Sequence, residues 1–190
     1  MSPYSVKIKK EIEESIKMAL HESMLEQERT TLDFFSEEAL RYIVMRHISK
    51  LKLFGSFPNS ENDRKRLIFE FNYKKAKTNE ATFRPDIASV KVKSLNSRKI
   101  EIEEYLLAVE LKITKSIDDI KKCKHYVSDR GRFKFHLAIC IILPSKQSYG
   151  ILHNFTKNHF TTAAKSNILL CTVDKEETGA RMPVAYWLNG

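Results

Sequence analysis

Near the start of the chain, apolar residues recur at the spacing of an α-helix and are separated by charged residues. Between Val6 and Glu28 they lie at Ile8, Ile12, Ile16, Ala19, Leu20 and Met24. This period predicts an amphipathic helix. Two roles are open for its apolar stripe: it packs against the rest of the chain, or it contacts a second copy in a homodimer.

A second helical pattern follows Ser36, whose side chain suits an N-cap, and two acids occupy its first turn. Its apolar face contains Leu40, Ile43, Val44, His47 and Leu51. When this face is extended back at about 100° per residue, Glu37 lies near its edge and Glu38 points away. His47 is interpreted as a core residue rather than a ligand. The polar segment 55–65 ends the helix.

The pattern then changes to the period of β-strands. Residues 66–73 alternate between apolar and polar, and a basic loop at 74–80 separates them from a second run at 82–92. This arrangement predicts a β-hairpin. A polar turn at 93–99 leads into a third strand that ends in the apolar stretch 105–113, so this strand is expected in the interior of a sheet.

Helices and buried strands alternate in the remaining sequence. A helix is predicted at 116–127, because acids lie in its first turn and bases in its later turns. Continuous apolar runs at 135–143 and 167–173 are typical of strands buried on both faces, with a helix at 149–160 between them. The order is then αβββαβαβ. A last edge strand is predicted around Pro183, which an edge tolerates.

Composition adds one strong bias, which is charge. The 190 residues, 42% of them hydrophobic, fit a single compact domain with appendages. The formal net charge is +9 and the sequence pI is about 9.4. Such a surface favours polyanionic partners such as nucleic acid, although a generally lysine-rich proteome would give the same excess.

Other features of composition exclude several classes. Cys123, Cys140 and Cys171 form no CxxC or Cys/His ligand pattern, which predicts reduced thiols in an intracellular, cytoplasmic protein. No secretion signal or long apolar run is present, so no membrane partner is expected. The chain has five glycines and no glycine-rich loop, which argues against a nucleotide cofactor.

Charged residues stand at unexpected places in two of the predicted strands. Asp86 follows Pro85 in FRPDIASV, and Glu110 and Lys112 lie two apart in LLAVELKIT. Strand alternation directs Glu110 and Lys112 to the same face. Either this face is exposed to solvent, or the charges belong to one site.

The segments RPDI and VELK resemble the PD-(D/E)xK motif of the restriction-endonuclease-like nuclease superfamily. The resemblance covers approximately residues 32–173. It implies an α/β restriction-endonuclease-like core, in which a central mixed sheet of four to five strands is flanked by helices in the order αβββαβ. Residues 31–190 would form this nuclease-like domain. Residues 1–30 would be an extra N-terminal helix that serves as a packing or dimer element.

The resemblance also implies a function and the residues that perform it. The expected activity is that of a Mg²⁺-dependent DNA endonuclease that hydrolyses phosphodiester bonds, with Mn²⁺ able to replace Mg²⁺. Asp86 and Glu110 would bind the metal together with the backbone carbonyl of Leu111, because Mg²⁺ prefers oxygen ligands and retains several waters. Lys112 would act on the attacking water. Glu37 would approach from the first core helix through a metal-bound water.

Further basic residues are expected to bind nucleic acid. In the helix at 116–127, Lys122 and Tyr126 share a face, and several branches of the superfamily have Gln and Tyr at these places. Lys121 is a second phosphate-binding candidate, and a solvated basic helix end is the alternative interpretation. The loop residues expected to follow the phosphate backbone are Lys74, Lys75, Arg130 and Arg132.

The sequence leaves the substrate open. Restriction, junction-resolving, repair and viral or mobile-element nucleases are all compatible with it, and DNA is not distinguished from RNA. An alternative is a non-catalytic nucleic-acid-binding module on the same fold. Another is a protein-binding accessory that uses its N-terminal helix. In the plainest interpretation, Glu110 and Lys112 are a solvated strand face.

Overall fold

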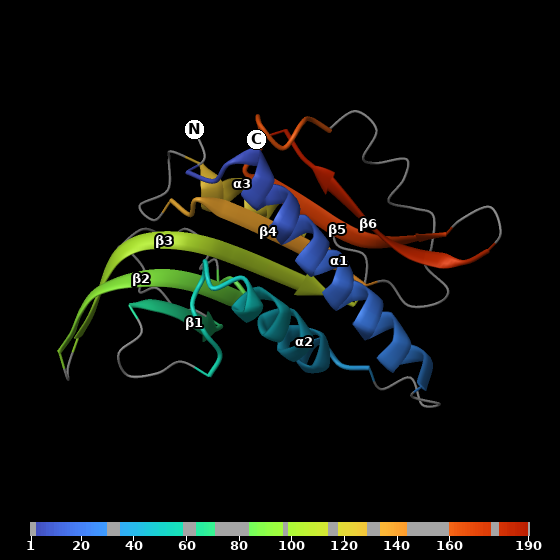
Figure 1. Cartoon of the computed structure of the whole chain (residues 1–190), viewed down its shortest axis with the longest axis horizontal. Helices are drawn as coiled ribbons and strands as arrows, with labels where there is room; N and C mark the ends of the chain where they lie inside the picture. Colours follow the sequence, from blue (N-terminus) through green and yellow to red (C-terminus); the bar gives the residue numbers. More distant parts are fainter. Residues whose placement is uncertain are drawn as a thin grey trace.

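The computed structural model has an α/β fold, and within the described residues it contains three helices and a six-stranded mixed sheet (Figure 1). It describes residues 3–29, 35–58, 64–70, 84–96, 99–113, 118–128, 134–143, 160–175 and 179–189. The helices are α1 (Val6–Arg29), α2 (Glu37–Lys50) and α3 (Asp118–Val127). The strands are β1 (Lys65–Phe69), β2 (Ile87–Asn96), β3 (Lys99–Lys112), β4 (Leu137–Ile142), β5 (Ile168–Lys175) and β6 (Arg181–Trp187).

The strands lie in the sheet in the same order as in the sequence, from β1 to β6. β1, β2 and β3 pair antiparallel, β3, β4 and β5 pair parallel, and β5 and β6 pair antiparallel. The sheet therefore has more strands than the expected four to five. β6 pairs with β5 along its length and forms one edge, where Pro183 is accommodated. β3 and β4 lie in the middle, and every residue of β4 is buried, as expected of a strand covered on both faces.

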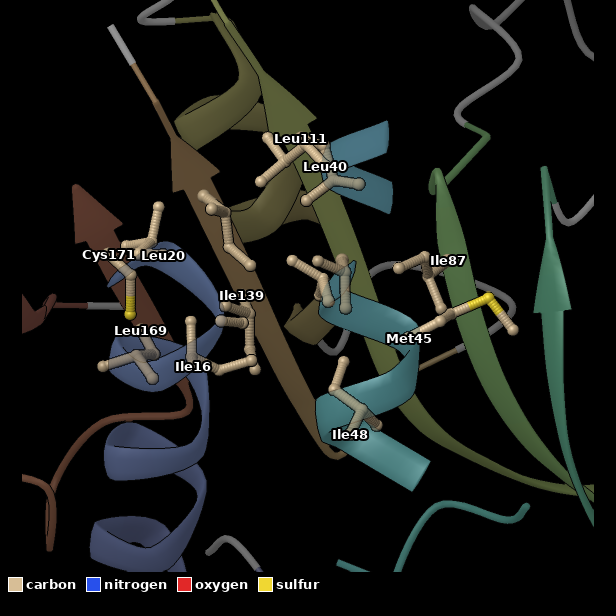
Figure 2. Packing of buried hydrophobic residues seen from close by; sticks show 14 of the residues in the cluster. Ile16, Leu20, Leu40, Met45, Ile48, Ile87, Leu111, Ile139, Leu169 and Cys171 are labelled. Atoms are coloured by element: carbon tan, nitrogen blue, oxygen red, sulfur yellow. The ribbon is translucent and has the colours of Figure 1, made fainter. Parts of the chain in front are cut away.

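The three helices of the described residues cover the two faces of the sheet unequally. α1 and α2 cross one face, and α3 covers the other (Figure 1). Figure 2 shows Ile16 of α1 and Leu40 of α2 directed at the sheet, where Ile139 of β4 lies between them. Alternation along β3 serves both layers, because Val109 packs with α1 and α2 while Ala108 packs with α3.

The apolar stripe of α1 is part of this core. Its buried residues include Ile12, Ile16, Ala19, Leu20 and Met24. α1 also packs along α2, where His47 is buried and its Nε2 lies 2.9 Å from Glu22 Oε2. His47 is thus a core residue with a polar partner, as the sequence predicts.

Polar contacts join α1 to β6 and to the segment that precedes β5. The buried ammonium of Lys9 donates to the carbonyl of Ala163 at 2.8 Å and also to the carbonyl of Ser166. It lies 5.2 Å from the centre of the Trp187 ring. The Trp187 indole donates to Glu13 Oε2 at 3.0 Å. α1 is therefore fixed by hydrogen bonds as well as by apolar packing.

Several element ends differ from the predicted ones. β1 ends at Phe69 rather than near residue 73, because Glu70 has a φ of 44°, which interrupts an extended strand. β2 and β3 continue to the pair Asn96 and Lys99, so most of the expected turn at 93–99 is strand. Cross-strand pairing extends the hairpin beyond what local sequence indicates. The predicted helix at 149–160 lies, except for its last residue, outside the described residues.

Two further findings concern the cysteines and the hydropathy of the helices. Cys123, Cys140 and Cys171 are buried free thiols. In the part of the chain that the structure describes, no helix is both long and apolar enough to cross a membrane.

Ser36→Ala is expected to lower the free energy of unfolding by about 1 kcal/mol. The Ser36 hydroxyl accepts a hydrogen bond from the amide of Ala39 at 3.2 Å, and alanine leaves that amide without this acceptor. Urea denaturation measures the effect. Ser49→Ala is the matched control on the same helix, because the Ser49 hydroxyl donates to the carbonyl of Arg46 and caps no helix start. Equal losses in both variants would contradict the capping role.

Candidate active site

The candidate residues gather at one end of the sheet, where β2 begins and β3 ends. Since these strands are antiparallel, Asp86, just before β2, lies beside the last residues of β3. Both α2 and α3 begin at this end. Glu37, the first residue of α2, contacts Lys112 of β3, and Lys122, near the start of α3, contacts Glu110 of β3. The positive ends of two helix dipoles thus favour negative charge here.

Asp86 joins the two sequence segments that resemble the nuclease motif. Its Oδ2 accepts a hydrogen bond of 2.7 Å from the amide of Leu111, the residue between Glu110 and Lys112. Burial raises the pKa of Asp86, while the bond from the Leu111 amide opposes this rise. The PD and ELK segments, separated by 25 positions between these two residues, are therefore in direct contact.

Glu110 is held by two residues of α3. Its side chain is 2% exposed, its Oε1 accepts a hydrogen bond of 2.5 Å from the Tyr126 hydroxyl, and its Oε2 lies 3.2 Å from Lys122 Nζ. Burial raises the pKa of Glu110 to about 7. The negative charge of Asp86 also raises the pKa of Glu110. Burial lowers the pKa of Lys122, but its hydrogen bonds to Asp119 and Glu110 outweigh this effect and raise the pKa, so the ammonium stays protonated.

Lys112 turns towards the opposite layer from Glu110. Its Nζ lies 3.3 Å from both carboxylate oxygens of Glu37. Alternation alone would direct Glu110 and Lys112 to one face. At the end of the strand, however, the long side chain of Lys112 reaches the first residue of α2. Glu38 is exposed, so Glu37 is the acid that faces the site.

Arg41 is a site residue that the sequence interpretation missed. It lies one turn after Glu37 on α2 and is 13% exposed. One guanidinium nitrogen lies 3.4 Å from Asp86 Oδ1 and the other 3.2 Å from Glu70 Oε1. The spacing of four residues from Glu37 is the signal that could have indicated it.

Asp119 is a second residue that was missed. Its side chain is 2% exposed, and its Oδ1 lies 2.7 Å from Lys122 Nζ. In the sequence, Asp118 and Asp119 look alike, because both are acids in the first turn of a helix. Only the fold distinguishes them, since Asp118 is exposed and pairs with the exposed Lys121 at 2.9 Å.

The remaining predicted nucleic-acid contacts divide into three kinds. Lys121 is on the surface of α3. Tyr126 is 1% exposed and packs edge-on against Phe135, so in this structure its hydroxyl serves Glu110 rather than the surface. The predicted contacts that lie outside the described residues are Lys74, Lys75, Arg130 and Arg132.

Comparison of the chain with protein-family models, curated proteins and solved structures gave no match. The interpretation of the site therefore depends on its own geometry.

The donor set bears on the expected metal. Asp86, Glu110 and the Leu111 carbonyl would offer oxygen atoms, which suit Mg²⁺, and Mg²⁺ keeps several of its waters. Among the described residues, no group of three or more His, Cys, Asp and Glu side chains is arranged to hold a metal ion. Instead, cationic groups lie at both carboxylates, Arg41 at Asp86 and Lys122 at Glu110. Oxygen ligands of this kind fit Mg²⁺, and the carboxylates of Asp86 and Glu110 already stabilise positive charge beside them.

Glu110→Gln is expected to change how stability depends on pH. Because the pKa of Glu110 rises from 4.5 to about 7 on folding, the folded protein holds this proton more tightly than the unfolded chain. The resulting stabilisation is full below the unfolded pKa and is lost as the pH rises through the folded pKa. Relative to the Gln variant, the wild type should lose on the order of 2 kcal/mol between pH 5 and pH 8. Urea denaturation in metal-free buffer measures this, and a constant difference would contradict it.

Proposed function

We propose that this protein is a Mg²⁺-dependent endonuclease that hydrolyses phosphodiester bonds in DNA. The observation that carries the proposal is the hydrogen bond of 2.7 Å from the Leu111 amide to Asp86 Oδ2. This bond brings together the two segments in which a PD-(D/E)xK nuclease keeps its metal ligands and its lysine. A chance occurrence of the same letters in the sequence would not require the segments to meet in the fold.

The topology around this bond supports a restriction-endonuclease-like core. From α2 to β4 the elements follow the order αβββαβ, with the first three strands antiparallel and β4 parallel to β3. In the proposal this segment is the catalytic core. Two additions surround this core. β5 and β6 continue the sheet beyond β4, and α1 packs beside α2 on the same face of the sheet.

Each residue of the site has a separate task in the proposed reaction. Bound Mg²⁺ would supply a water of lowered pKa and would offset the charge on the phosphate. Asp86 and Glu110 would bind it, and the Leu111 amide and the Tyr126 hydroxyl fix the orientation of these two carboxylates. Lys112, held beside Glu37, would orient the attacking water or take up the proton that the water loses.

The electrostatics of the chain suit a polyanionic substrate. The net charge of +9 attracts nucleic acid at long range. At the site itself, Arg41 offers a planar donor next to Asp86, and a guanidinium matches the oxygens of a phosphate. In the proposal, Lys121 and the basic loop residues bind flanking phosphates. A homodimer stays a prediction, which light scattering would test.

The proposal is tested by incubating the purified protein with supercoiled plasmid, branched DNA, single-stranded DNA and RNA. Cleavage is expected with Mg²⁺ or Mn²⁺ and none with EDTA. The substrate that is cleaved fastest also distinguishes restriction-like, junction-resolving and repair-type activity. Failure to cleave any of these substrates with either metal would contradict the proposal.

One observation favours a second candidate, a nucleic-acid-binding module without catalysis. The three predicted acids already have cationic neighbours, since Glu37 pairs with Lys112 and the carboxylates of Asp86 and Glu110 face Arg41 and Lys122. A site balanced in this way is stable without a metal. Calorimetric titration with Mn²⁺ separates the two candidates. Metal binding that depends on the carboxylates supports the nuclease, and DNA binding without metal binding supports the module.

A further inference from the structure

Asp119 has a buried carboxylate oxygen that the proposed reaction does not use. The residue is 1% exposed, and its Oδ2 has no hydrogen-bond partner among the described residues. Its other oxygen, Oδ1, lies 2.7 Å from Lys122 Nζ. A buried carboxylate oxygen without a donor is unfavourable, so it indicates an interaction that forms in another state of the site.

The Lys122 ammonium lies between Asp119 and Glu110. Its distance to Glu110 Oε2 is 3.2 Å, longer than its 2.7 Å distance to Asp119 Oδ1. An ammonium has three donors, and these two contacts use two of them. Lys122 is therefore shared between an acid proposed to bind metal and an acid that is not.

Metal and ammonium compete for Glu110. If a divalent cation binds Glu110, it approaches the carboxylate that Lys122 now contacts, and the two positive charges repel each other at this separation. Lys122 is partly buried, so leaving Glu110 without a new acceptor would desolvate its charge at a cost. Asp119 Oδ2 is an acceptor of opposite charge on the same helix, and it is already buried beside Lys122.

We propose that Asp119 is a positioning residue that receives the Lys122 ammonium when a divalent cation binds at Glu110. This inference rests on the proposed metal site. Lys122 keeps its contact with Asp119 Oδ1, leaves Glu110 Oε2 and gains Asp119 Oδ2. The exchange satisfies the unpartnered oxygen and frees one oxygen of Glu110. Asp119 therefore sets the affinity of the site for metal without touching the metal.

The neighbouring pair on α3 provides a matched control. Asp118 and Lys121 have the same spacing in the same helix and a similar ion-pair distance, 2.9 Å. Both side chains are more than 70% exposed, at 81% and 73%. Asp118→Asn removes the same charge from the same helix turn and should leave metal affinity within about twofold, because exposed pairs contribute little.

The test is calorimetric titration of the whole protein with Mn²⁺. Asp119→Asn is expected to weaken Mn²⁺ binding by about 10- to 100-fold. This is the usual effect of removing a residue that orients a metal ligand without touching the metal. Lys122→Met removes the competing ammonium and is expected to bind Mn²⁺ at least as tightly as the wild type. In the double variant, Asp119→Asn should have almost no further effect, because its role is exercised through Lys122.

Three outcomes would overturn the inference. Asp119→Asn could bind Mn²⁺ like the wild type, it could lose affinity equally with and without Lys122, or Lys122→Met could bind more weakly than the wild type. If the wild type itself binds no Mn²⁺, the proposed metal site fails along with this inference. If Mn²⁺ binding depends on Asp86 and Glu110 but is unchanged in Asp119→Asn, the metal site stands and only the inference about Asp119 fails. Thermal unfolding without metal verifies that each variant is folded, and Lys122→Met tests the competition independently of Asp119→Asn.

Discussion

Asp86→Ala is expected to abolish Mn²⁺ binding and cleavage together, whereas Lys112→Ala should lower cleavage by about 10²- to 10⁴-fold and retain the metal. The difference follows from their contacts. Asp86 is a carboxylate beside the ELK segment, and Lys112 is a cation paired with Glu37. Calorimetry and the rate of plasmid nicking, measured on the same preparations, separate metal binding from proton transfer.

Glu38→Gln is the control for these substitutions. Glu38 is exposed and adjacent to Glu37. The substitution Glu38→Gln therefore changes the charge near the site and leaves the hydrogen bonds of Glu37, Asp86 and Lys112 in place. Its nicking rate should equal that of the wild type within about threefold. Cleavage that survives both Asp86→Ala and Lys112→Ala would show that the activity arises elsewhere in the protein.

Lys9→Met is expected to lower the free energy of unfolding by about 2–4 kcal/mol, which would make it the most damaging substitution of a charged residue in α1. The ammonium is buried and donates to the carbonyls of Ala163 and Ser166. Methionine fills a similar volume but donates nothing, so these acceptors would lose their donor. Urea denaturation measures the loss from the transition midpoint at an unchanged slope.

Lys10→Met is the control, because Lys10 is the next residue of the same helix and is exposed. It should change stability by less than about 0.5 kcal/mol. A similar small change in Lys9→Met would mean that the carbonyls find other donors, and that the anchoring of α1 depends on apolar packing alone.

Local sequence predicts the elements that local physics determines. The amphipathic period of α1, the cap of α2 at Ser36 and the wholly buried strand β4 are all found in the structure. The end of β1 was wrong because it depends on the positive φ of Glu70, a non-glycine residue. The length of the β2–β3 hairpin was wrong because cross-strand pairs, rather than turn-forming residues, determine it.

The candidate site divides in a similar way. Spacing in the sequence correctly indicated that Glu110 lies on a strand and Glu37 at a helix start. It did not indicate that Glu110 is held by α3 while Lys112 reaches α2, since these contacts join different layers. Arg41 was missed because charged residues make up 30% of the chain, so pairs at helical spacing are too frequent to distinguish one.

The anchoring of α1 has a consequence for how the protein is made. Lys9 and its acceptor Ala163 are separated by 154 positions, and Glu13 and Trp187 by 174. At ordinary rates of translation, α1 leaves the ribosome roughly 10–30 s before these partners. During that interval its apolar stripe lacks the β5 and β6 surface that it covers in the folded protein. The chain therefore completes its core only after β6 has been translated, and α1 is among the first elements made but among the last to be fully packed.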